Sequence, residues 1–170
     1  MPTFRLPGPG FNRPRLLAGL FALVVGVVFY FLERPPGQTY FLPDGLVPPD
    51  TAGHVPGMVG QSVPTFLHPF AFSLLTASLL RVRWTGALVI CAGWALVESL
   101  FEIGQYPPVA EWIAHHRPSG FEAVPLLENV DDYFLRGRFD IADLAAIWLG
   151  AGLALPVIHL TRRYDPPDDG

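Results

Sequence analysis

The sequence predicts an all-α fold, a four-transmembrane-helix bundle with Pro/Gly-rich and partly helical extracytoplasmic loops. Of the 170 residues, 51% are hydrophobic and only 15% are charged, and the mean hydropathy is +0.36. This composition departs from that of soluble globular domains. The apolar residues gather in four runs, each long enough as a helix to cover most or all of a hydrocarbon core about 30 Å thick. The arginines, in turn, gather in alternate connections between these runs.

The four runs define the expected organisation of the chain. The first, LLAGLFALVVGVVFYFL, contains no charged residue. A signal-peptide core is the alternative, but Glu33-Arg34-Pro35-Pro36 follows the run where a small-residue cleavage site would stand. We therefore expect a single transmembrane domain, residues 16–160, with spans at about 16–32, 64–80, 84–103 and 141–160, outer loops at 33–63 and 104–140, a cytoplasmic N-terminal segment at 1–15 and a cytoplasmic tail at 161–170.

The distribution of arginine predicts the orientation, because short Arg-rich connections tend to stay in the cytoplasm. One face receives Arg5, Arg13, Arg15, Arg81, Arg83, Arg162 and Arg163, and the other receives Arg34, Arg117, Arg136 and Arg138 together with most of the acids. Both termini are therefore predicted to be cytoplasmic. The expected location is the inner (cytoplasmic) membrane of a bacterium, as a multi-pass protein.

The two outer loops differ in character. Residues 33–63 are dense in proline and glycine, which predicts irregular chain lying over the bundle. In residues 104–140, Pro107-Pro108 favours a short helix through Val109–Ala114, and Pro125–Leu135 favours another. The tail from Asp165 to Gly170 is polar and is expected to be a flexible terminus.

Several function classes are disfavoured by composition. All 11 basic residues are arginines and the net charge is -4, so the chain has no basic excess that would recruit nucleic acid. The single Cys91 excludes an internal disulfide and a cysteine-based metal cluster. Neither an H-E-x-x-H metal motif nor an activated nucleophile is recognisable. We therefore assign no catalytic residue, no metal and no cofactor.

The informative residues are the polar ones inside or next to the spans, because a charge within hydrocarbon costs about 2.5 kcal/mol or more. Glu98, Glu102 and Gln105 stand at i, i+4 and i+7, on one helical face near the outer end of the third span. Three helices thus bring polar side chains to one outer level. The predicted ligand site or polar network comprises His68, Glu98, Glu102, Gln105, Arg138, Asp140 and Asp143, with Arg138 paired to Asp143 or Glu102.

Each of these residues also has a purely structural interpretation. Asp140 suits the N-cap of the fourth span, where a carboxylate accepts hydrogen bonds from free amides. Glu102 and Gln105 lie near the interface, where they are open to solvation, and His68 near a helix start is more often a satisfied polar residue than a ligand. Small residues allow close helix approach, so Gly150 and Ala154 are predicted to mark a helix contact.

Two motifs carry a resemblance to a known family. Glu102-Ile-Gly-Gln105 ends one span, and Gly137-Arg138-Phe-Asp140-Ile-Ala-Asp143, followed by Gly150, begins the next. Together they resemble the VanZ-like family of bacterial membrane proteins, in which a Glu-x-x-Gln pair and an Arg…Asp…Asn…Gly signature take these positions. The match covers roughly residues 65–156. The chain departs from the family at Ile147, where many members carry Asn, and in a longer segment before Arg138, so it resembles a divergent member.

The resemblance implies a role at the cell envelope, where VanZ-like proteins are associated with tolerance of glycopeptide antibiotics. Three functional hypotheses remain open. The first is that the outer polar cluster binds a lipid headgroup, anionic or from a cell-envelope lipid carrier, with Arg138 contacting phosphate. The second is a non-catalytic accessory or assembly subunit of a larger membrane complex, docking through its outer loops. The third is an intramembrane lipid-modifying enzyme.

Overall fold

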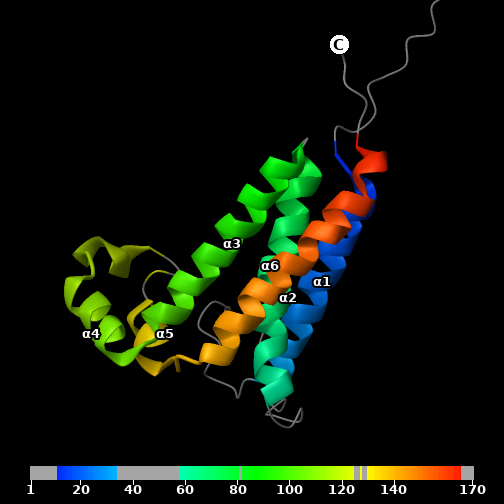
Figure 1. Ribbon diagram of the computed structural model, residues 1–170. Helices are drawn as coiled ribbons and strands as arrows, with labels where there is room; N and C mark the ends of the chain where they lie inside the picture. Colours follow the sequence, from blue (N-terminus) through cyan, green and yellow to red (C-terminus); the bar gives the residue numbers. More distant parts are fainter. Residues whose placement is uncertain (1–10, 34–57, 81, 125–126, 128–129, 166–170) are drawn as a thin grey trace, which may run out of the picture.

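The computed structural model describes residues 11–33, 58–80, 82–124, 127 and 130–165. In these ranges the chain is all-helical and contains no strand, which confirms the all-α part of the predicted fold class. The helices are α1 (Arg13–Glu33), α2 (Met58–Leu79), α3 (Trp84–Gly104), α4 (Pro107–His116), α5 (Val130–Arg136) and α6 (Ile141–Leu160), with the 3-10 helices η2 (Ser119–Ala123) and η3 (Arg162–Tyr164). The four long helices lie together, and α4 and α5 form a side lobe beside the end of α3 (Figure 1).

Two of the long helices, α3 and α6, are long and apolar enough to cross a membrane. Their bounds agree with the predicted third and fourth spans to within one residue. Only 28% and 33% of their most apolar segments are buried within the protein. The central helix of a soluble protein would be mostly buried, so these helices present most of their apolar surface to the surroundings. This supports the predicted membrane class.

The predicted boundary of the second span is wrong. We expected the span to begin at about Pro64, with Pro69 near its first turn, where the missing N–H of a proline is tolerated. Instead α2 begins at Met58 and includes both Pro64 and Pro69. Helix α2 packs against both α1 and α6. Most of the first predicted outer loop, residues 34–57, lies outside the described residues.

The segment predicted to be the second outer loop, residues 104–140, is partly helical. Helix α4 spans Pro107–His116, with Pro107 and Pro108 in its first turn, and so contains the predicted Val109–Ala114 segment. The helix predicted at residues 125–135 is observed as α5 from Val130, and residues 125–126 and 128–129 lie outside the described residues. The 3-10 helix η2 was not predicted.

The interior of the bundle is built from small residues. Helix α2 lies between α1 and α6, and α3 packs on α2 and α6. The buried core includes Ala77, Ala87, Ala95, Ala151 and Ala154, with Leu74, Ile147 and Ile158 as its larger members. Small side chains let helix backbones approach closely, which is the packing typical of membrane helices.

Gly150 marks the closest approach of two helices. A Cβ atom added there would overlap the backbone carbonyl oxygen of Phe66 in α2, whereas one added at Gly152 would meet nothing within 4 Å. Ala154, one turn further along α6, is fully buried in the core. Gly150 thus packs against α2, and Ala154 lies in the core shared by α2, α3 and α6.

At one end of the bundle, the Arg15 side chain is fully buried and joins three helices. Its Nη1 atom donates to the carbonyl oxygen of Ala77 at 2.6 Å, and Nη2 donates to that of Ile158 at 3.0 Å. Its Nε atom donates to Thr161 Oγ1 at 3.1 Å, and Nη2 lies 3.2 Å from Asp165 Oδ1. The guanidinium therefore donates to carbonyls in the last turns of α2 and α6. At these C-terminal ends, a positive charge also interacts favourably with the helix dipoles.

Asn12 completes this arrangement. Its Oδ1 atom accepts a hydrogen bond from the Arg15 amide (3.1 Å), as an N-cap does for α1. Its Nδ2 atom donates to the carbonyl oxygen of Thr161 (2.8 Å) and to Asp165 Oδ1 (2.7 Å), and its own amide donates to the Ser78 carbonyl. We call Asn12, Arg15, Thr161 and Asp165 the Arg15 cluster. Asp165, expected in a flexible tail, is held by these bonds.

Replacing Gly150 with Ala is expected to lower the thermal midpoint of the detergent-solubilised protein, at a cost of about 1–3 kcal/mol, because the added methyl group forces α2 and α6 apart. Gly152→Ala is the matched control and should leave the midpoint unchanged or slightly higher, since its site is open. Equal midpoints for the two variants would contradict the close contact at Gly150.

Arg15→Gln is expected to destabilise the protein by about 3 kcal/mol, because it removes the ion pair with Asp165 and the guanidinium donors to the carbonyls of Ala77 and Ile158. Arg13→Gln removes the same charge from the same helix turn, but Arg13 is exposed. Thermal unfolding of both variants, followed by circular dichroism, measures the difference. The stabilising role of Arg15 is excluded if both variants unfold at the same temperature.

Candidate functional site

At the end of the bundle opposite the Arg15 cluster, acidic side chains from α3 and α6 meet a serine from α2. We define the acidic cluster as Ser62, Glu102, Asp140 and Asp143. The C-terminal end of α3 supplies Glu102, and the start of α6 supplies both aspartates. Glu102, Asp140 and Asp143 lie close enough to repel one another electrostatically. They are three of the seven residues that were predicted to converge at this level.

Glu102 is the most enclosed of the three acids, with 7% of its surface exposed. Its Oε1 atom accepts a hydrogen bond from the backbone amide of Asp140 at 2.7 Å. Asp140 is the N-cap of α6, so the Glu102 carboxylate lies at the positive end of the α6 dipole. A backbone amide and the helix dipole thus stabilise the buried charge.

The two aspartates have different partners. The Oδ1 atom of Asp140 accepts from the amide of Ala142 at 2.9 Å, so its predicted role as the N-cap is confirmed. Asp143 is half-buried in the first turn of α6, and its Oδ1 atom accepts from the Ser62 hydroxyl of α2 at 3.1 Å. The Asp140 carboxylate is exposed. The cluster is therefore exposed to its surroundings at Asp140. Glu102 and Asp143 are instead held by hydrogen bonds to neighbouring elements of the bundle.

The predicted pairing of Arg138 with Asp143 or Glu102 does not occur. Arg138 is exposed and forms an ion pair with neither acid. It belongs to the short non-helical connection between α5 and α6. The physical reason is that both carboxylates already accept hydrogen bonds from other groups. The backbone amide of Asp140 donates to Glu102, and the Ser62 hydroxyl donates to Asp143. We had assumed that these carboxylates need a charged partner, whereas neutral donors satisfy them.

Gln105 lies beside the acidic cluster and connects α3 to the side lobe. Its Nε2 atom donates to the Tyr133 hydroxyl of α5 at 3.2 Å. Its side chain also lies against Gly137, where an added Cβ atom would overlap it, and Phe134 is packed in the same way against Gly104. Gln105 and Gly104 therefore position the connection that leads into α6.

Glu98 and His68 lie outside the acidic cluster. Glu98 is half-buried on α3, one turn before Glu102, and has no hydrogen bond or ion pair with any described residue. His68 is half-buried on α2, and its ring lies 5.9 Å from that of Phe72. The predicted network of seven residues is thus divided into the acidic cluster, the Gln105 contact, and three residues that do not join it.

Two members of the site were missed by the sequence analysis. Ser62 fell in the segment predicted to be loop, because the helix start was placed at Pro64, and Tyr133 was not considered. Ser62 stands one helical turn before Phe66 in the sequence. In the structure Phe66 contacts Gly150 of α6, so both residues lie on the side of α2 that meets α6. Extending the α2 helix backward by two residues would have placed Ser62 at the level of Asp143.

The acidic cluster presents carboxylate and hydroxyl oxygens at the end of the bundle where α2, α3 and α6 meet. Such oxygens accept hydrogen bonds and attract positively charged groups. In the part of the chain that the structure describes, no group of three or more His, Cys, Asp or Glu side chains is arranged to hold a metal ion. The arrangement is therefore suited to binding a cationic or hydrogen-bond-donating group.

Comparisons of the chain with protein-family models, with curated proteins and with solved structures find no match.

Proposed function

We propose that the chain is an integral protein of the bacterial inner membrane, crossing it four times with both termini in the cytoplasm. Many large apolar side chains on the long helices face outward. Examples are Phe21 (72% exposed), Leu100 (68%) and Ile141 (70%). Exposed apolar area of this extent on a soluble monomer would be unusual, whereas lipid covers it on a membrane protein. Helices α1 and α2 belong to the same bundle as the two membrane-compatible helices.

The arginine asymmetry supports this orientation, with the Arg15 cluster at the cytoplasmic end and the acidic cluster at the outer end. Reporter fusions at Ser119 and after Asp165 test it. A reporter active only outside the cytoplasm is expected to be active at Ser119 and inactive after Asp165. The reverse pattern, or the same activity at both sites, would exclude the proposed topology.

We also propose that the chain is a divergent VanZ-like protein and that its outer end binds the headgroup of a cell-envelope lipid. The observation that carries the proposal is the acidic cluster itself. Glu102, Asp140 and Asp143 meet Ser62 at the end of the bundle where α2, α3 and α6 come together. Adjacent carboxylates disfavour a purely anionic headgroup and favour one that carries an amine. The exposed Arg138, two residues before Asp140, is available to contact the phosphate of the same headgroup. Phosphate and amine together define a zwitterionic headgroup.

Native mass spectrometry of the protein in mild detergent tests this proposal. The intact protein is expected to bind phosphatidylethanolamine more strongly than phosphatidylcholine, whose methylated amine cannot donate hydrogen bonds to the carboxylates. Asp143→Asn combined with Glu102→Gln should remove most of this preference while keeping similar side-chain shapes. Glu111→Gln, which changes an exposed acid of α4, is the matched control. A preference that persists in the double variant would exclude the acidic cluster as the site.

A role as a non-catalytic accessory subunit is the second candidate, favoured by the side lobe of α4, η2 and α5. Its Trp112, Val124 and Leu135 are large, apolar and exposed, and Arg117 pairs with Asp131 within the lobe (2.9 Å). An exposed apolar surface rimmed by charges is typical of protein interfaces. The same purification distinguishes the two functions, because an accessory subunit retains a stoichiometric protein partner.

A further inference from the structure

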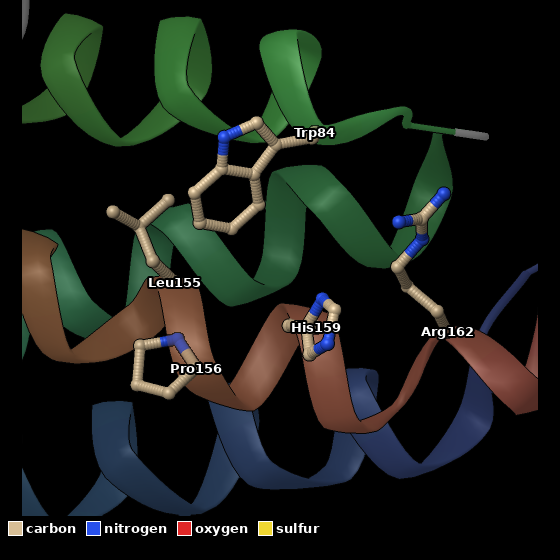
Figure 2. Close-up of a pocket in the computed structure, with 5 residues that line it drawn as sticks. All are labelled: Trp84, Leu155, Pro156, His159 and Arg162. Carbon is tan, nitrogen blue, oxygen red and sulfur yellow. The ribbon is translucent and has the colours of Figure 1, made fainter.

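A groove lies between α3 and α6 at the same end of the bundle as the Arg15 cluster, far from the acidic cluster. It has a volume of 420 Å³ and is lined by Trp84, Leu155, Pro156, His159 and Arg162. In Figure 2, Leu155 and Pro156 lie on the left and Arg162 on the right, with Trp84 and His159 between them. The rings of Trp84 and His159 meet edge to face, with centroids 6.2 Å apart.

The groove is almost entirely apolar, although one of the residues that line it is a basic one. The five lining residues together offer the groove almost no polar surface. Arg162 is exposed, and no described residue forms an ion pair with it. The nearest candidate, Asp165, is already bound by Arg15 and Asn12. The neighbouring Arg163 differs, because its guanidinium lies over the Tyr164 ring, 4.9 Å from the centroid.

We propose that this groove binds an anionic glycerophospholipid, with one acyl chain against Trp84, Leu155 and Pro156 and the phosphate on Arg162. The site lies at the ends of the two helices that are long and apolar enough to cross a membrane, so lipid is the substance that surrounds it. A tryptophan beside an arginine is typical of the level of lipid headgroups. Basic residues on the cytoplasmic side attract anionic lipids. The proposal rests on the membrane location proposed above and not on the acidic cluster.

Charge complementarity selects this occupant. An acyl chain fits the apolar groove. The phosphate, outside the groove, accepts hydrogen bonds in a bidentate manner from the exposed Arg162 guanidinium. A net negative headgroup is favoured over a zwitterionic one, because an amine or choline would be placed close to Arg162. This preference is opposite to the one proposed for the acidic cluster, so the two sites are separable by lipid type.

The test measures phosphatidylglycerol binding to the full chain in mild detergent by native mass spectrometry. Arg162→Gln is expected to weaken binding about fivefold, the contribution of one arginine at a membrane surface. Arg163→Gln is the matched control, since it removes the same charge one residue away without changing the groove. Equal weakening by both variants would mean general electrostatic attraction and would overturn the site.

The acyl-chain contact needs a second pair of variants. Trp84→Ala removes one wall of the groove and is expected to weaken phosphatidylglycerol binding about fivefold, by loss of apolar contact. Trp148→Ala is the control, because Trp148 is similarly exposed (51% against 48% for Trp84) but does not line the groove. Unchanged binding in Trp84→Ala, or displacement of the lipid by inorganic phosphate alone, would exclude an acyl chain in the groove.

Two further outcomes separate this proposal from its alternatives. The Asp143→Asn, Glu102→Gln double variant should bind phosphatidylglycerol as the intact protein does, even if the headgroup proposal for the acidic cluster fails. A dimer that persists without added lipid and is lost in Trp84→Ala would instead identify the groove as an interface between two copies of the chain, and would overturn the lipid site.

Discussion

The buried guanidinium of Arg15 is the constraint on which the bundle depends. A charge removed from solvent is tolerated only when its donors are all satisfied, and here the acceptors come from α2, α6 and the turn after α6. Because these bonds fix how far each helix extends along the bundle, they also fix which residues meet at the other end. The level shared by Ser62 and Asp143 follows from that alignment.

Small residues make up most of the interior of the bundle, and most of the large apolar residues lie on its exterior. Alanine and glycine fill the contacts among α2, α3 and α6, and the bulky apolar side chains point away from the core. In water this distribution would be unfavourable, because burial of large apolar groups drives folding. In lipid, close backbone approach and polar bonds replace that driving force. The Arg15 cluster and the acidic cluster are the polar bonds at the two ends.

Hydropathy predicted the helical elements well because span length is set by a single physical dimension. The bounds of α3 and α6 and the cap at Asp140 follow from local composition. The partners of the polar groups did not follow, since they depend on contacts between residues far apart in sequence. Arg15 was interpreted only as a topology signal, and Arg138 was assigned to acids that the Asp140 amide and Ser62 satisfy. Side-chain charge is visible in a sequence, whereas a free amide at a helix start is visible only once the helix is placed.

The span between Arg15 and its acceptor on Ile158, 143 residues along the chain, sets an order for biosynthesis. During synthesis α1 emerges long before α6 exists, and loop closure over such a distance is slow. Until then the guanidinium has no carbonyl from α6 to bind. Helix α1 therefore reaches its final position only after α6 has formed, and a ribosome that stalls before Ile158 leaves a bundle that cannot close.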